Sequence, residues 1–177
     1  MLPPENRFML ISGTEKSGKT NMIRLLSGQL RKTQTIAVIG TGADEDAERK
    51  IAETVGKVNR GEKTALLIDD LPGWLTRTEP ETADMLEELV VRRDDHFSLY
   101  ASGDADELIR AEGGVIPEMI RSGCFILLGS SFQEHSGDFE ADNIGYVQRE
   151  RQMPPGGGYL IWKRKATAFK AIFWEPL

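Results

Sequence analysis

Short apolar runs recur along the chain and alternate with amphipathic stretches. Runs rich in β-branched and other apolar residues predict strands over residues 7–11, 35–39, 64–70, 97–101 and 124–128, the third of them ending in two acids. The last run is apolar at every position. That pattern indicates a strand buried on both faces, as in a parallel sheet.

The stretches between these runs place apolar residues three or four positions apart, which is the spacing of an amphipathic helix. They predict helices over residues 21–30, from Asp44 onward, from Pro80 to about 94, over 104–111 and, for one or two turns, over 116–121. Asp44 is a suitable cap for the second helix. The acids that follow it either complement the helix dipole or form an ordinary solvated first turn.

The last third of the chain has a different pattern. Residues 130–143 are polar apart from Phe132 and Phe139, and we expect a loop there. A Pro- and Gly-rich turn at 153–158 precedes two apolar segments, 159–162 and 168–173, which predict a terminal hairpin joined through Lys163-Arg164-Lys165. We find no internal repeat and no linker, so we expect one domain over residues 1–177.

The first strand and helix enclose a candidate nucleotide site. Gly13 to Thr20 read Gly-Thr-Glu-Lys-Ser-Gly-Lys-Thr, which fits the phosphate-loop pattern. The glycines allow the backbone N–H groups to wrap a polyphosphate, and the helix dipole favours the anion. Lys19 would neutralise the outer phosphates, and Thr20 would ligate Mg²⁺. The candidate nucleotide-binding residues are Gly13, Thr14, Glu15, Lys16, Ser17, Gly18, Lys19, Thr20 and Asn21.

A second nucleotide signature ends the third strand. Apolar residues are followed directly by Asp69 and Asp70, which would lie at the carboxyl edge of the sheet, level with the phosphates. We assign Asp69 to magnesium. Asp70 has two interpretations: it polarises the attacking water, or it only caps the loop 71–74.

Three polar residues near the fourth and fifth predicted strands also have two possible interpretations each. Ser102 either senses the γ-phosphate, a catalytic role, or caps the helix that follows. Arg110 and Arg121 are candidates for an arginine finger acting on a neighbouring subunit, and ordinary solvated arginines are the alternative.

Composition limits the classes of partner. The 177 residues carry a net charge of −6 and a pI near 5.1, which argues against a nucleic-acid partner because phosphate contacts need a basic surface. Two histidines and one cysteine argue against a zinc site, and the single Cys124 fits a reducing cytoplasm. No apolar run reaches the roughly 20 residues of a membrane span.

Several of these segments together resemble one family. The phosphate loop after residues 8–12, the strand ending in Asp69-Asp70, the segment 122–129 and the Pro-Pro-Gly-Gly-Gly-Tyr-Leu-Ile segment at 154–161 are similar to the FtsK/SpoIIIE branch of RecA-like ATPases. They most resemble the C-terminal ATPase domain of the type VII secretion coupling ATPases, EssC and EccC. The resemblance covers nearly the whole chain.

The resemblance implies an α/β, RecA-like fold, with a mainly parallel central sheet flanked by helices. It implies ATP and Mg²⁺ as cofactors, and a membrane-anchored parent protein with several ATPase modules, this one at its cytoplasmic end. It also implies two partners: the neighbouring ATPase domains and the C-terminal export signal of secreted proteins. The membrane would be reached only through the parent chain.

Two departures from the active motors of this branch affect the expected chemistry. Asp70 stands where those motors have Glu, and Ser102-Gly103-Asp104 stands where they have a sensor. We therefore expect ATP binding with slow or absent hydrolysis. The alternatives are an active oligomeric ATPase motor with sites shared between subunits, and a protein-binding module with a relic phosphate loop.

Overall fold

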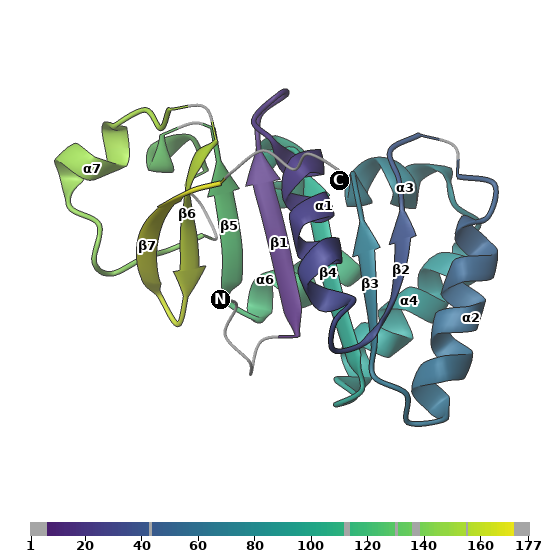
Figure 1. Cartoon of the computed structure of the whole chain (residues 1–177). Helices are drawn as coiled ribbons and strands as arrows, with labels where there is room; N and C mark the ends of the chain where they lie inside the picture. Colours follow the sequence, from purple (N-terminus) through teal and green to yellow (C-terminus); the bar gives the residue numbers. More distant parts are fainter. Residues whose placement is uncertain are drawn as a thin grey trace.

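A computed structural model describes residues 7–171 except 43, 112–113, 130, 136–138 and 155. Its centre is a seven-stranded sheet in the order β2-β3-β4-β1-β5-β6-β7 (Figure 1). The strands are β1 Phe8–Gly13, β2 Thr35–Ile39, β3 Thr64–Ile68, β4 Phe97–Gly103, β5 Cys124–Leu128, β6 Gly157–Trp162 and β7 Lys165–Lys170. The pairings among β1 to β5 are parallel, whereas β6 and β7 are antiparallel. The predicted α/β fold with a mainly parallel sheet and a terminal hairpin is confirmed.

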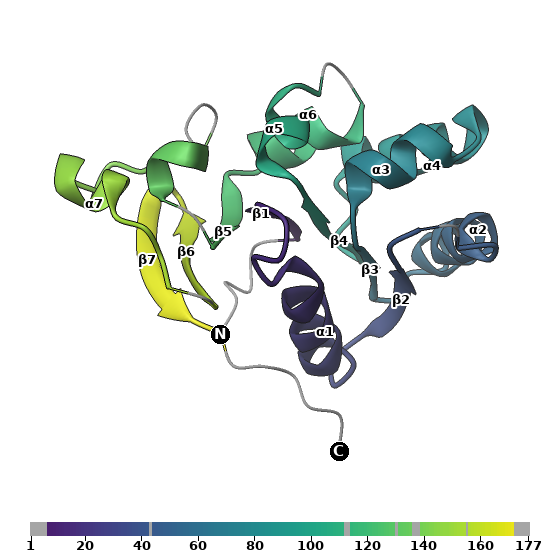
Figure 2. The ribbon, with the colours of Figure 1, turned by 90° about the horizontal axis from the view of Figure 1, so that it is seen from above.

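Helices cover both faces of this sheet. They are α1 Lys19–Leu30, α2 Ala47–Asn59, α3 Leu71–Arg77, α4 Pro80–Arg92, α5 Ala105–Ile109, α6 Val115–Arg121 and α7 Tyr146–Glu150. Figure 2 shows α1 on one side of the sheet and α3 to α6 on the other. In the described part of the chain, the predicted helices form within a few residues of the expected bounds. None of the helices described is long and apolar enough to cross a membrane.

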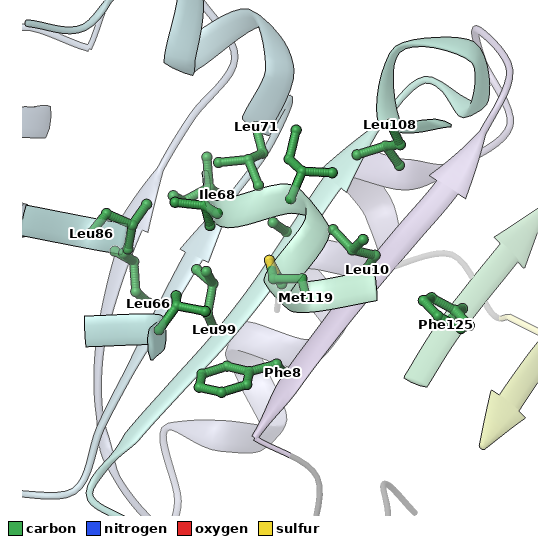
Figure 3. Packing of buried hydrophobic residues seen from close by; sticks show 14 of the residues in the cluster. Phe8, Leu10, Leu66, Ile68, Leu71, Leu86, Leu99, Leu108, Met119 and Phe125 are labelled. Atoms are coloured by element: carbon green, nitrogen blue, oxygen red, sulfur yellow. The ribbon is translucent and has the colours of Figure 1, made fainter. Parts of the chain in front are cut away.

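Two hydrophobic clusters explain this layering. Alternate residues of each strand face opposite sides, so Leu10 joins one cluster while Met9 and Ile11 join the other. The larger cluster packs β-strand residues against α2 to α6, and Figure 3 shows Leu99 and Phe8 of the sheet lying under Met119 of α6. The smaller cluster packs the opposite sides of the same strands against α1. The strand runs are nearly continuous in apolar residues because both faces are buried.

Residues 71–74, which we expected in a loop, instead begin helix α3. Asp70 leaves the strand in a left-handed conformation, with φ 67°, and its carboxylate accepts a hydrogen bond from the Gly73 N–H at 3.2 Å. This is the geometry of a helix cap, and a proline in the first turn of a helix costs no hydrogen bond. The Pro-Gly pair therefore marks a helix start here and not a turn.

The segment between β5 and β6 is also more ordered than a simple loop. It contains a 3₁₀ turn, η1 (Phe132–His135), and beyond it α7, neither of which the polar sequence predicts. The two phenylalanines are buried. Phe132 packs against Tyr159 and Phe139 against Phe125, with ring centroids 5.8 and 4.7 Å apart. They anchor an otherwise polar segment over β5 and β6.

The hairpin turn is tighter than expected. Only Lys163 and Arg164 connect the strands, and both have positive φ, 49° and 61°. Positive φ at both central residues is the conformation that suits the twist of a two-residue hairpin. The second strand therefore begins at Lys165 and not at 168, and the expected end at 172–173 lies outside the described residues.

Asp44 caps the turn before α2, since the helix itself begins at Ala47. Its carboxylate accepts hydrogen bonds from the Asp46 N–H at 3.1 Å and from Lys50 Nζ at 2.8 Å. These contacts, the Lys50 hydrogen bond above all, hold the pKa of Asp44 below its usual value. They fix the connection that follows β2.

We expect Asp44→Asn to lower the free energy of unfolding by about 1 kcal/mol at pH 7. Because the pKa of Asp44 is lower in the folded state, its contribution is present above the unfolded pKa of about 4 and is lost as pH falls through the folded value. Urea unfolding from pH 7 to pH 2.5 measures this difference. Glu53→Gln, which removes an exposed ion pair with Arg49 on the same helix, is the control and should change the free energy of unfolding much less than Asp44→Asn does.

Candidate functional site

A cleft of about 450 Å³ lies at the edge of the sheet where β1, β3 and β4 end and α1 begins. Carboxyl ends of parallel strands are the usual place for a ligand in an open α/β sheet. The residues lining the cleft are Glu15, Lys19, Thr20, Thr41, Asp69, Asp70, Asp104, Asp106 and Glu107. The lysine of the phosphate loop and both magnesium candidates, Thr20 and Asp69, therefore share one cavity.

The phosphate loop links β1 to α1 directly. Gly13 is the last residue of β1, and Gly18 precedes Lys19, the first residue of α1. Lys16 and Gly18 have positive φ, 63° and 105°, and such left-handed residues turn successive N–H groups toward an anion. A Cβ at Gly13 would collide with the Ser17 side chain and lie 3.1 Å from the Leu128 carbonyl oxygen, so a larger residue does not fit there unless Ser17 moves. Both glycines thus have a physical role.

Lys19 is bonded to its own loop in this structure. Its Nζ donates to the carbonyl oxygens of Gly13 at 2.7 Å and Thr14 at 2.8 Å. The ammonium group is therefore held at the loop, beside the cleft. A phosphate ligand would have to share or replace these two acceptors.

Asp69 lies at the floor of the cleft and is 4% exposed. Ser102 of β4, which is fully buried, donates to Asp69 Oδ1 at 2.6 Å and accepts from the Asp70 N–H at 3.0 Å. The serine hydroxyl joins the ends of β3 and β4 and orients the carboxylate. Ser102 does not cap the next helix, whose preceding residue is Asp104.

The Asp70 side chain makes structural contacts with helix α3. Its carboxylate caps α3 through Gly73, as described above, and lies 3.7 Å from Arg77. Of the two interpretations of Asp70, the capping role is therefore observed. The segment that it caps is helix α3 and not the expected loop. Its side chain also borders the cleft, so the role toward water stays a prediction.

Ser102→Ala tests the orienting role of this hydroxyl. The change leaves the Asp70 N–H and Asp69 Oδ1 without this partner, so we expect a loss of about 1–3 kcal/mol in the free energy of unfolding. We also expect the affinity for Mg²⁺-nucleotide to fall several-fold, because the carboxylate is no longer held. Ser98→Ala, at the opposite end of the same strand, is the control, and its nucleotide affinity should equal the wild type in the same titration. Equal affinities in both variants would contradict the role given to Ser102.

The donor set fits a magnesium ion that keeps most of its water. Thr20 and Asp69 offer a hydroxyl and a carboxylate, both hard oxygen ligands. Among the described residues there is no group of three or more His, Cys, Asp or Glu side chains placed to hold one metal. Mg²⁺ typically binds through one or two protein oxygens together with substrate phosphates, so this sparse set is compatible with it and not with a metal cage.

The cleft carries more negative charge than the motif suggests. Of the nine described residues that line it, six carry carboxylates and one, Lys19, is basic. Asp104, Asp106 and Glu107 come from the connection to α5 and from α5 itself, and Thr41 comes from the turn after β2. Two signals are present in the sequence, the acids after Ser102-Gly103 and the Gly40-Thr41-Gly42 turn, but neither shows which side of the sheet its residues reach.

The remaining candidate residues make ordinary contacts. Glu15 and Lys16 are exposed and pair with each other at 3.6 Å, while Asn21 lies in the first turn of α1. Arg121 pairs with Glu118, and Arg110 ends α5. Neither arginine lines the cleft, so a finger role would require a second subunit.

Two contacts that support the phosphate loop were not predicted from the sequence. Ser12 Oγ lies 3.0 Å from His135 Nδ1, and both side chains are buried. This contact connects the residue before the phosphate loop to η1, 123 positions later. Gly129, at φ 74°, lies against Ser17, where a Cβ would approach the Ser17 Cβ to 2.5 Å. No local pattern marks either contact.

Comparison with known proteins gives a likeness in fold. No protein-family model matches the chain, and no curated protein sequence matches it. Among solved structures it resembles EssC (ATPases 2 and 3) from Geobacillus thermodenitrificans, with a TM-score of 0.76 and 15% identity over 96% of this chain. It also resembles Thermomonospora curvata EccC (ATPases 2 and 3) in complex with a signal sequence peptide, with a TM-score of 0.73 and 16% identity over 98% of this chain.

The chain spans 37% of that EssC structure and 38% of that EccC structure. A third match, the genome packaging NTPase B204 from Sulfolobus turreted icosahedral virus 2 in complex with ATP-gammaS, is covered completely, with 97% of this chain, a TM-score of 0.60 and 15% identity. The similarity to EssC and EccC ATPase domains expected from the sequence is confirmed at the level of the fold.

Proposed function

We propose that this chain is an ATP- and Mg²⁺-binding module of an FtsK/SpoIIIE-family type VII secretion ATPase. The observation that carries the proposal is the meeting of Lys19, Thr20 and Asp69 in one cleft at the carboxyl edge of a fold shared with ATPase modules. A lysine, a hydroxyl and an acid from two distant segments are the parts that phosphoryl-binding sites of this class use. A solved NTPase of similar fold holds ATP-gammaS.

Each part has a defined task in this proposal. The loop backbone from Gly13 to Thr20 wraps the phosphates, and Lys19 exchanges its two carbonyl acceptors for phosphate oxygens. Thr20 and Asp69 would hold Mg²⁺, which would neutralise part of the charge on the nucleotide. Ser102 keeps the Asp69 carboxylate in place.

The carboxylates around the cleft give the metal a second role. ATP without a divalent cation carries several negative charges and would meet six carboxylates and one lysine. Mg²⁺ offsets part of that repulsion. Nucleotide binding should therefore depend on Mg²⁺ more strongly than the two candidate ligands alone require.

Hydrolysis is slow or absent in this proposal. Asp70 stands where active motors place a glutamate, and its shorter side chain is bonded to Gly73 and lies near Arg77. A carboxylate committed to a helix cap is a weak general base because it must leave its partners to reach water. Nucleotide would act by shifting the population of module arrangements, and not by repeated turnover.

The partners follow from the likeness to EssC and EccC. Those structures contain successive ATPase modules, and one of them holds a signal sequence peptide. We propose that this chain likewise contacts neighbouring ATPase domains and receives the export signal of secreted proteins, as the cytoplasmic part of a membrane-anchored protein. The acidic composition supports a protein cargo over DNA.

Calorimetric titration of the whole chain with ATP tests the proposal, with Mg²⁺ and with a chelator. We expect measurable binding with Mg²⁺ and at least about tenfold weaker binding without it. Turnover should stay near zero as the protein concentration rises. Absence of binding at millimolar ATP and Mg²⁺ would leave a protein-binding module with a relic loop, and turnover that rises steeply with concentration would indicate an oligomeric motor.

A further inference from the structure

Strand β2 forms one edge of the sheet, and in the described part of the chain it has a neighbour on one side only. That neighbour is β3 (Figure 1). The hydrogen bonds to β3 use the Thr35 N–H, at 3.0 Å, and the Ile39 carbonyl, at 2.9 Å. Because alternate residues of a strand direct their backbone groups to opposite neighbours, Ile36 and Val38 direct their N–H and C=O groups outward.

The two ends of this edge are closed within the chain. The Gln34 N–H donates to the Leu30 carbonyl at 3.1 Å, and the Gly40 N–H donates to the Asp44 carboxylate at 3.4 Å. The open section of the edge therefore runs from residue 36 to residue 38.

The opposite edge of the sheet, at β7, is partly covered by the chain itself. The Asn143 side chain accepts from the Ala166 N–H at 2.7 Å and donates to the Ala166 carbonyl at 2.9 Å. The Asp142 N–H donates to the Arg164 carbonyl at 2.8 Å. Among the described residues β2 has no such cover, and its sequence Thr-Ile-Ala-Val-Ile contains no charged residue and no proline, which would discourage pairing. Of the two edges, β2 is thus the one suited to receive a strand.

We propose that β2 of a second copy of this chain pairs with this edge in antiparallel orientation, with a two-fold axis at Ala37. Ile36 of each copy then lies opposite Val38 of the other in a hydrogen-bonded pair, which uses the outward N–H and C=O groups of both residues. Ala37 lies opposite its own copy, in the non-hydrogen-bonded pair between them. Such a pair brings the Cα atoms to about 4.5 Å, and the small side chain of alanine allows this approach.

The order of charges around β2 favours a second copy in this orientation. The exposed basic residues Arg31 and Lys32 precede the strand, and three acids at 44–46 follow it. The register that pairs position 36 with position 38 places position 32 opposite position 42, so the basic flank of each copy lies beside the acidic flank of the other. A parallel pairing would bring like charges together. The edge is therefore self-complementary in the way that a two-fold interface requires.

The side chains of the edge add apolar contact to the backbone hydrogen bonds. Ile36 and Val38 pack against the hydrophobic cluster on the α1 face but remain half-buried. Residues opposite each other in antiparallel strands share a face, so Ile36 of one copy would cover Val38 of the other. The contact area is small, and we expect a dissociation constant in the micromolar range or weaker. The inference goes beyond the function proposed above and needs no bound nucleotide.

Ala37→Cys in the whole chain tests the register. A cysteine at the two-fold axis would meet its copy at a Cα separation that suits a disulfide, so mild oxidation should give a covalent dimer. Thr35→Cys is the matched control on the same face of the same strand, since it would lie roughly 13 Å from its own copy and should stay monomeric. The native Cys124 is fully buried and should not interfere. Equal cross-linking of the two variants, or none with Ala37→Cys, would overturn the proposed register.

Sedimentation and amide hydrogen exchange test the pairing on the unmodified protein. We expect a dimer fraction that rises with concentration, and exchange at the Ile36 and Val38 amides that slows at least about tenfold between dilute and concentrated samples. The Ala37 and Ile39 amides, which face β3, should change much less. A monomer at every concentration, with both outward amides exchanging fast, would overturn the proposal.

Val38→Pro separates this edge from any other contact surface. The change removes an outward N–H without breaking a hydrogen bond to β3, and proline is tolerated at such edge positions. It should abolish the dimer, while thermal unfolding confirms that the variant is folded. Val38→Thr keeps the N–H and the β-branched shape, so it should still dimerise. A dimer that forms equally well in folded Val38→Pro would assign the contact to another surface and contradict the pairing of β2.

Discussion

Lys19→Ala should reduce the affinity for Mg²⁺-ATP at least about 100-fold, which corresponds to about 3 kcal/mol. Among the described residues that line the cleft, Lys19 is the one with a basic side chain, so none of the others replaces its charge. Its removal leaves the phosphates facing carboxylates. Calorimetric titration with ATP and Mg²⁺ measures the loss directly.

The structure supplies a matched control for Lys19→Ala. Lys16 lies in the same loop but is 88% exposed and pairs with Glu15. Lys16→Ala should therefore change ATP affinity by no more than a few-fold. Because Lys19 also binds the carbonyls of Gly13 and Thr14, thermal unfolding of both variants should accompany the titration. If Lys19→Ala retained wild-type affinity while remaining folded, the loop would not be a phosphate site.

Asp69→Asn should remove most of the magnesium dependence of ATP binding. Asparagine keeps the size of the side chain and can still accept from Ser102, so the local structure should persist. It lacks the negative charge that Mg²⁺ favours in a ligand. We expect ATP affinity in Mg²⁺ to fall about 10- to 100-fold, toward the value measured with a chelator.

Asp70→Asn is the control that separates loss of the magnesium ligand from loss of any one negative charge beside the cleft. The Asp70 side chain caps α3, so its replacement should lower the free energy of unfolding by about 1 kcal/mol or less. Its effect on the ratio of affinities with and without Mg²⁺ should be small. If the two variants lost magnesium dependence equally, the assignment of the metal to Asp69 in particular would be wrong.

The sequence predicted the parts of the site that depend on local spacing. The phosphate loop lies within eight consecutive residues, from Gly13 to Thr20, and its flanking strand and helix carry strong periodic patterns. The strand before Asp69 is short, has four consecutive apolar residues at 65–68 and is followed by an acid, so its position was also evident. These features are encoded by neighbours in the chain.

Contacts between distant segments could not be predicted in this way. The hydrogen bond from Ser102 to Asp69 joins positions 33 apart, and the contact between Ser12 and His135 joins positions 123 apart. Both arise only when β1, β3, β4 and η1 are assembled. Helix α3 was missed for a different reason: the Pro-Gly pair favours a turn, while the Asp70 cap, which decides the outcome, needs the strand end to place it.

The order of strands leaves β2 and β7 at the two outer positions of the sheet. An outer strand presents unsatisfied backbone groups that can template lateral growth into fibrous aggregates. In β7, exposed lysines stand at both ends, Lys165 and Lys170, and charges of this kind discourage such growth. Growth of the sheet by pairing of β7 with a strand of another molecule is therefore disfavoured.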